Sequence, residues 1–197
     1  MDLNLCWRGP VGPGSFPTAP NAVEAINKAG VYLRLKLYEG GRTIAYVGQS
    51  GHLMTRFDQH LTRLLSLHQP LRDASGYVVD QRGVENRFMA LNAISTVAPL
   101  AIEEILRTQF YFSLAEDGFD VEYLSLIEAM LKARAEVVMY EQPENIQSIN
   151  PGEFDHDILI VSDFSKVEAS GQELIERVIG DTPIEIPAAQ ELFANAD

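Results

Sequence analysis

Hydrophobic and polar residues alternate strictly over residues 31–38, and this period of two predicts a half-buried β-strand. Two glycines at positions 40 and 41 predict a tight turn. After it, residues 43–47 return as a second strand, so the segment predicts a β-hairpin. The apolar positions of the first strand are Val31, Leu33, Leu35 and Leu37, and the positions between them are Tyr32, Arg34, Lys36 and Tyr38.

A helix is predicted directly after the hairpin, over residues 52–67, because apolar side chains recur there at spacings of four, four and three. These apolar residues are Leu53, Phe57, Leu61 and Leu64. A second stripe with the same spacing lies on a neighbouring face and consists of His52, Arg56, His60 and Arg63. This stripe is either a solvated helix face or a set of side chains that converges with Tyr32 beside the glycine that ends the hairpin.

Residues 108–114 are rich in aromatic side chains and predict a third strand, and residues 120–136 predict a long helix with its apolar side turned inward. The weaker pattern between them and the hairpin predicts an insertion at about residues 70–106. We therefore expect an α/β fold with a small three-stranded mixed or antiparallel sheet flanked by helices, and a small C-terminal αβ appendage.

Three regions follow from this pattern. Four prolines and three glycines between positions 8 and 20 predict that residues 1–29 form an extended leader with one short helix. Residues 30–154 form the main domain with its insertion. Residues 155–197 form the acidic appendage.

Composition narrows the class of protein. The 197 residues contain one cysteine, Cys6, which excludes an internal disulfide framework and a thiolate zinc site. No apolar run has the roughly 18 residues that a membrane span needs, and the N-terminus has no signal-peptide pattern. We therefore expect a cytoplasmic protein without a membrane partner.

Charge is distributed unevenly along the chain. The net charge is −13, yet residues 1–70 hold seven basic and four acidic groups, whereas residues 116–197 hold four basic and nineteen acidic groups. A phosphate partner such as DNA is therefore compatible only with the N-terminal half. The acidic C-terminal third is expected to meet a protein partner or a second copy of the chain, or to keep the basic half off DNA.

Two tripeptides, an arginine and a histidine in this order resemble the signature of the GIY-YIG nuclease superfamily: Gly30-Val31-Tyr32, Tyr46-Val47-Gly48, Arg56 and His60. The histidine one turn after the arginine is similar to the restriction-endonuclease branch. The family also has a glutamate on a later apolar helix, which Glu128 matches, and an asparagine after a proline, for which Asn145 and Asn150 both compete.

The resemblance implies a nuclease that hydrolyses DNA phosphodiester bonds with Mg²⁺ or Mn²⁺, in restriction, defence or repair. It makes Glu128 the metal ligand, a role that suits the oxygen preference of Mg²⁺. It makes Arg56 the group that stabilises charge on the phosphoryl oxygens, and Tyr32 the general base or proton relay. Tyr46 would position water or phosphate, and His60 would share proton transfer with Tyr32. The predicted substrate-binding residues are Gly48, Gln49, Ser50, Arg63 and Asn145.

Other interpretations of the same residues remain open. Tyr32 is also a plausible outer-face strand residue, and Glu128 lies on a polar stripe where Lys132, four residues on, can neutralise it. The alternative function is a catalytically inactive GIY-YIG-fold protein that binds or regulates through its acidic C-terminal region. A third is a nuclease for RNA or single strands.

Overall fold

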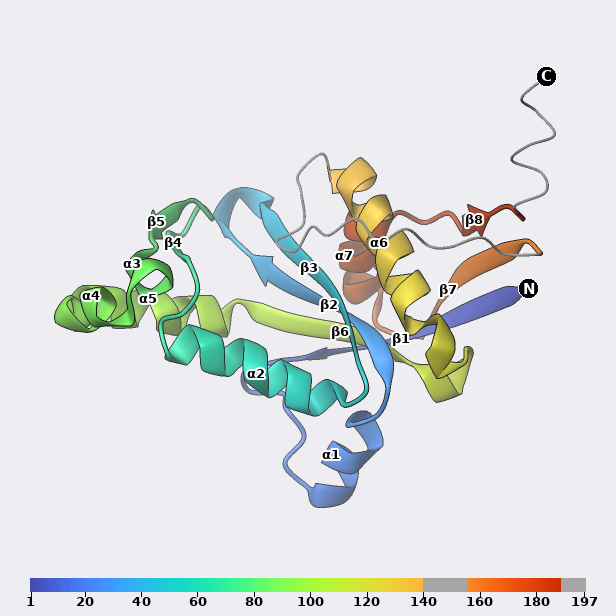
Figure 1. Cartoon of the computed structure of the whole chain (residues 1–197), viewed down its shortest axis with the longest axis horizontal. Coiled ribbons are helices and arrows are strands. Elements are labelled where there is room, and N and C mark those ends of the chain that lie inside the picture. The colour runs from blue at the N-terminus through green and yellow to red at the C-terminus, as the bar shows by residue number, and fades with distance from the viewer. Residues whose placement is uncertain (140–155, 189–197) are drawn as a thin grey trace.

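The computed structural model describes residues 1–139 and 156–188 of the chain (Figure 1). A six-stranded mixed sheet forms its centre, with the strand order β3-β2-β6-β1-β7-β8. The strands of this sheet are β1 (Asp2–Val11), β2 (Gly30–Leu37), β3 (Thr43–Ser50), β6 (Thr108–Leu114), β7 (Ile158–Lys166) and β8 (Ile184–Ile186). A separate two-stranded sheet pairs β4 (Leu71–Arg72) with β5 (Val78–Asp80).

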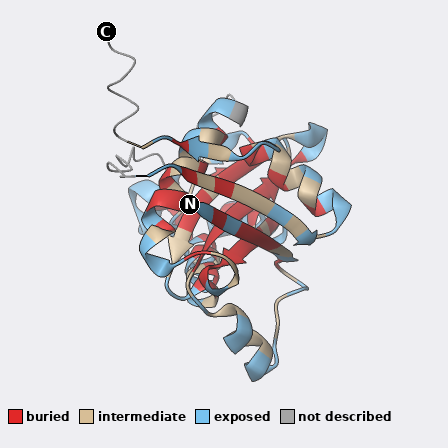
Figure 2. Ribbon diagram, turned by 90° about the vertical axis from the view of Figure 1, so that its right-hand side faces the viewer, coloured by how far each residue is buried: buried red, intermediate tan, exposed pale blue. Residues whose placement is uncertain are grey.

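Helices cover both faces of the large sheet (Figure 1). The helices of the described residues are α1 (Pro20–Ile26), α2 (Leu53–Leu65), α3 (Arg82–Glu85), α4 (Arg87–Asn92), α5 (Ile94–Leu106), α6 (Leu124–Met139) and α7 (Ala169–Ile179). Buried residues follow the strands, and exposed residues lie on the outer sides of the helices (Figure 2). None of these helices has both the length and the apolar character that crossing a bilayer requires.

The prediction of a small three-stranded sheet is wrong, although the α/β class is right. The three predicted strands are β2, β3 and β6, and they do pair antiparallel with β2 in the middle. The sheet continues beyond β6 through β1, which is antiparallel to β6 and parallel to β7. The additional strands therefore come from the segments that the sequence placed in the leader and in the appendage.

The strand β1 was missed because its proline and glycine residues obscured a period-two pattern. Leu3, Leu5 and Trp7 are all buried, as alternate residues of a strand should be. Pro10 lies where the pairing of β1 with β6 shifts its register, and such irregularities accommodate a proline that has no N–H to donate. The first part of the predicted extended leader, Asp2–Val11, is thus an inner strand of the sheet.

The predicted hairpin and the helix after it are confirmed. In the hairpin, Tyr32 pairs with Gly48 and Arg34 pairs with Tyr46. The helix α2 spans nearly the predicted range and buries the apolar stripe through Leu53, Phe57 and Leu64.

The two faces of the sheet carry different cores. Val31, Leu33 and Leu35 of β2 pack in one core with Ile127 and Leu131 of α6, and α7 contributes to the same core. Tyr32 belongs to the other core, where Phe57 of α2 stacks with Phe110 of β6 at 4.2 Å between ring centroids. The helices α2 and α6 consequently lie on opposite sides of the β2–β3 hairpin (Figure 1).

Candidate active site

The predicted catalytic side chains of the hairpin share one face of the sheet because strand side chains alternate. The register places Tyr32, Arg34 and Tyr46 on the face that α2 covers. Arg56 and His60 are four residues apart on α2, so they project from one side of the helix. The sequence thus brings these side chains together from two strands and one helix.

The structure joins four predicted residues by hydrogen bonds, and we call Tyr32, Tyr46, Arg56 and His60 the Tyr–Arg–His cluster. The Oη atom of Tyr32 lies 2.7 Å from Nε2 of His60. Arg56 donates from Nε to Oη of Tyr32 at 3.2 Å and from Nη2 to Oη of Tyr46 at 3.3 Å. The two tyrosine rings stack with centroids 6.0 Å apart. One guanidinium therefore ties both tyrosines together.

Burial divides this cluster into an inner and an outer part. Tyr32 has no exposed surface and His60 is 2 % exposed, whereas Tyr46 and Arg56 are half-buried. A ligand from solvent therefore meets the Arg56 guanidinium and the Tyr46 side chain first. Tyr32 and His60 lie deeper in the core, and the Tyr32 hydroxyl accepts a hydrogen bond from Arg56.

Gly48 provides the space that the Tyr32 ring occupies. A Cβ atom at position 48 would lie 2.5 Å from Oη of Tyr32, which is far inside a normal contact distance. Gly51, three residues later, has open space at the same position. The role of Gly48 in substrate binding remains a prediction. Its role in packing is to leave room for the Tyr32 ring, which a side chain at position 48 would displace.

We expect Gly48→Ala to lower the free energy of unfolding by about 1–3 kcal/mol, the usual cost of overpacking a filled core. The new methyl group must displace the Tyr32 hydroxyl from Arg56 and His60. Gly51→Ala is the matched control and should stay within about 0.5 kcal/mol of wild type. Urea denaturation of the three proteins measures both values, and equal stability of all three would contradict the tight packing at Gly48.

The environment changes the acidity of the two inner residues in opposite directions. Burial raises the pKa of Tyr32 above its ordinary value, with a smaller contribution from Tyr46, while the hydrogen bond from Arg56 lowers it. Burial, followed by the positive charge of Arg34 and Arg56, lowers the pKa of His60 to about 2. At neutral pH Tyr32 is therefore a neutral phenol and His60 a neutral imidazole.

His60 makes the stability of the fold dependent on pH. In the unfolded chain a histidine takes up a proton near pH 6.5, whereas in the folded protein the pKa of His60 is about 2. The unfolded state therefore binds more protons between these values, and stability falls as the pH drops below 6.5.

We expect His60→Gln to remove up to about 1.4 kcal/mol per pH unit from the slope of unfolding free energy against pH between 6 and 4. His52→Gln, a change at an exposed histidine one residue before α2, is the control and should keep the wild-type slope. Urea denaturation at several pH values measures these slopes. An unchanged slope in His60→Gln would mean that the imidazole is not held neutral.

Glu128 lies apart from this hydrogen-bonded cluster. Its carboxylate forms an ion pair with Lys132, with Oε1 and Nζ 3.0 Å apart, and both side chains are 13 % exposed. The predicted pairing of these two residues is thus confirmed. Its helix α6 packs on the opposite face of the sheet from α2.

Helical geometry places Glu128 and Arg134 on different sides of α6. On α6, Arg134 marks the side next to α7, because its Nε donates to the carbonyl oxygen of Ile179 at 3.1 Å. Glu128 lies about 120° around the helix from Arg134, on the other side of the buried Ile127 and Leu131. Among the described elements, α6 also packs against β3, the edge strand that carries Tyr46. The helix that carries Glu128 and the Tyr–Arg–His cluster therefore lie on opposite faces of the same edge strand.

Among the predicted site residues, Glu128 is the one whose carboxylate could hold Mg²⁺. Mg²⁺ binds proteins through one or two carboxylates and completes its shell with water and substrate phosphate, so a single glutamate is sufficient as the protein ligand. Within residues 1–139 and 156–188 no group of three or more histidine, cysteine, aspartate or glutamate side chains is arranged to hold a metal. The carboxylate of Glu128 must exchange its contact with Lys132 for the ion.

The predicted substrate-binding residues occupy varied positions. Gln49 faces the α6 side of the sheet, because it pairs with Val31. Ser50 accepts a hydrogen bond from the backbone N–H of His52 at 3.0 Å and so shapes the turn before α2. Arg63 is exposed on α2. Asn145 and its competitor Asn150 lie outside the described residues.

Two buried cations lie on the same face of β2 as Tyr32, and the sequence did not identify them as site residues. Arg34 is 2 % exposed, and its Nη1 lies 3.0 Å from Nδ1 of His60. Lys36 is 1 % exposed and forms an ion pair of 2.6 Å with Glu104 of α5. Tyr38 donates to the other oxygen of Glu104 at 2.8 Å. The period-two pattern already placed these residues on the Tyr32 face, and that signal was sufficient to find them.

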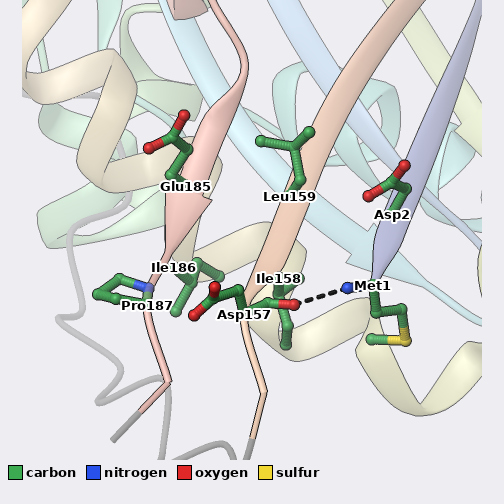
Figure 3. A pocket seen from close by; sticks show the side chains of 8 residues that line it. All are labelled: Met1, Asp2, Asp157, Ile158, Leu159, Glu185, Ile186 and Pro187. Atoms are coloured by element: carbon green, nitrogen blue, oxygen red, sulfur yellow. Dashed lines mark hydrogen bonds between the residues drawn. The ribbon is translucent and has the colours of Figure 1, made fainter. Parts of the chain in front are cut away.

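A cavity of about 540 Å³ lies between the ends of β1, β7 and β8 (Figure 3). Asp2, Asp157 and Glu185 line it, and the amino group of Met1 donates to the carbonyl oxygen of Asp157 at 2.7 Å. Three carboxylates repel a phosphate, so this cavity does not suit a nucleic-acid backbone.

No family model, curated protein or solved structure matches the chain.

Proposed function

We propose that the chain is a phosphodiester hydrolase of the GIY-YIG type that cleaves DNA, in restriction, defence or repair. The single observation that carries the proposal is the Tyr–Arg–His cluster, in which residues spaced over 29 positions of sequence meet in one hydrogen-bonded group. An ordinary solvated helix face does not explain it, because His60 and Tyr32 are buried together.

Arg56 is the residue we assign to the phosphate. Its guanidinium is half-buried and held by two tyrosine hydroxyls, so its orientation is fixed before substrate arrives. A preorganised donor fork of this kind stabilises negative charge as it develops on phosphoryl oxygens. Tyr46 shares the accessible side of the cluster and would orient the phosphate or the attacking water.

Tyr32 is the residue we assign to proton transfer. Its raised pKa favours the protonated phenol at neutral pH, so it acts as a relay that holds a proton rather than as a free base. Glu128 would hold a Mg²⁺ or Mn²⁺ ion, which supplies neutralisation of charge on the phosphate when bound. Lys132 would release Glu128 in that state.

DNA is the partner we propose for this face, since the N-terminal half has an excess of basic residues. Arg63, exposed on α2, and Gln49, Ser50 and Asn145 remain proposed contacts to the substrate. The acidic C-terminal third would meet a protein partner or a second copy. The free Cys6 is compatible with the reducing cytoplasm, where we propose that the protein acts.

Cleavage of plasmid and linear DNA in the presence of Mg²⁺ tests this proposal. We expect the wild type to cut, and Glu128→Ala to lose about 10²-fold or more of the rate, as losses of direct transition-state stabilisers do. Glu136→Ala, at an exposed glutamate on the same helix, is the matched control and should cut normally. An inactive wild type, or full activity in Glu128→Ala, would refute the proposal.

The complete burial of Tyr32 favours a second candidate, a GIY-YIG-fold protein that binds DNA or regulates without turnover. It predicts Mg²⁺-independent DNA binding that weakens as salt rises, with no cleavage. Deleting residues 155–197 is unsuitable for testing the acidic region, because β7 in this segment pairs along β1. A binding assay of the full chain at two salt concentrations, run beside the cleavage assay, separates the two candidates.

A further inference from the structure

His60 is held between two partners, one at each ring nitrogen. Arg34 on β2 places its Nη1 atom 3.0 Å from Nδ1 of His60 and 3.5 Å from the side-chain oxygen of Gln69. On the other side of the ring, Nε2 lies 2.7 Å from Oη of Tyr32. Arg34 and His60 are each 2 % exposed, so water has little access to either nitrogen.

The chemistry of arginine decides which nitrogen of His60 carries the proton. A guanidinium has only donors, so an N–H of Arg34 directed at Nδ1 needs a lone pair there. A neutral imidazole has one N–H, and it must then be on Nε2. The Nε2–H group points at Oη of Tyr32.

Two N–H groups therefore converge on the Tyr32 oxygen, one from His60 and one from Nε of Arg56. A histidine that donates to Tyr32 cannot also accept its proton. This differs from the expectation that His60 shares proton transfer with Tyr32.

We propose that Arg34 is a positioning residue that locks neutral His60 in its Nε2–H tautomer, so that His60 serves Tyr32 as a hydrogen-bond donor and not as its base. In the proposed hydrolase, on which the catalytic consequence rests, the two donors fix the position of the Tyr32 oxygen and with it the direction of the Tyr32 hydroxyl. Arg34 acts through His60 and needs no contact with substrate.

Nitrogen-15 NMR of the histidine rings tests the tautomer in the full-length protein, with no substrate present. The chain has four histidines, and His60→Gln identifies the signals of His60. At neutral pH we expect a protonated Nε2 and an unprotonated Nδ1 in wild type. Arg34→Met should shift the signals toward a mixture of tautomers, and Arg34→Lys, which retains a donor-only group, should restore the wild-type pattern.

A wild-type His60 with its proton on Nδ1, or an Arg34→Met protein with the wild-type pattern, would overturn the inference. The wild-type spectrum alone is decisive if Arg34→Met does not fold. Gln69→Leu is the control, since Gln69 contacts Arg34 but not the ring, and it should leave the tautomer unchanged. A protein that shows the Nε2–H tautomer and cleaves no DNA would refute the proposed function and leave this inference standing.

Discussion

Arg56→Ala is expected to lower the rate of DNA cleavage by about 10²–10³-fold, the loss typical of a preorganised donor aimed at a developing oxyanion. The substitution removes the group that contacts both tyrosine hydroxyls and would contact the phosphate. It should cost little stability, because Arg56 is only half-buried. Single-turnover cleavage at saturating protein measures the rate, and thermal unfolding verifies the fold.

Arg56→Lys separates charge from geometry. A lysine keeps the positive charge, but its single ammonium cannot reproduce the two bonds that a planar fork makes to Tyr32 and Tyr46. We therefore expect a rate close to that of Arg56→Ala and DNA binding close to wild type. A lysine variant that cleaves at the wild-type rate would show that positive charge alone suffices and that the cluster geometry is unimportant.

Glu104→Ala is expected to destabilise the fold by about 3–5 kcal/mol, because it leaves the Lys36 ammonium in the core without its carboxylate. Both side chains of this ion pair are almost completely buried, and the bond is 2.6 Å long. The hydroxyl of Tyr38 also loses its acceptor. The pair joins α5 of the insertion to β2, so the loss should loosen the insertion from the sheet.

The neighbouring glutamate provides the control for this prediction. Glu103 is 53 % exposed and forms an ion pair with Arg107 at 3.1 Å on the surface of α5. Glu103→Ala should change stability by less than about 1 kcal/mol, as exposed pairs do. Chemical denaturation of both variants gives the comparison, and similar values for Glu103→Ala and Glu104→Ala would contradict the structural importance of the buried pair.

The elements around the site could be predicted because their patterns are local. Alternation in β2 and β3 and the stripe of Leu53, Phe57 and Leu64 in α2 each depend on residues close in sequence. The convergence of Tyr32 with His60 then follows from the alternation of a strand and the period of a helix. These regularities predicted the convergence as one of two alternatives, beside a solvated helix face, and the structure shows the side chains in contact.

The extent of the sheet could not be predicted because it depends on partners far apart in sequence. The strand β1 is stabilised by pairing with β6 and β7, whose residues lie about a hundred or more positions away in the sequence. A local reading of Pro10 and its flanking glycines therefore favours a loop. Glu104 was missed for a similar reason, since only the folded chain brings it to Lys36.

Glu128 is the predicted site residue whose position in the fold could not be inferred from the sequence. Its pairing with Lys132 and its similarity to the family glutamate could both be recognised from the sequence. Its position on the opposite face of the sheet from α2 could not be predicted, because that position depends on which side of the hairpin α6 packs. The cluster and the helix that carries Glu128 lie on opposite faces of β3.

The central claim is that the Tyr–Arg–His cluster and Glu128 serve one phosphate, and titration with paramagnetic Mn²⁺ tests it most directly. The ring signals of Tyr46 and His60 are followed by NMR in wild type and in Glu128→Ala. We predict that Mn²⁺ broadens both signals in wild type and that this broadening is lost in Glu128→Ala. Signals that stay sharp in wild type, or that broaden equally in the variant, would contradict a shared site.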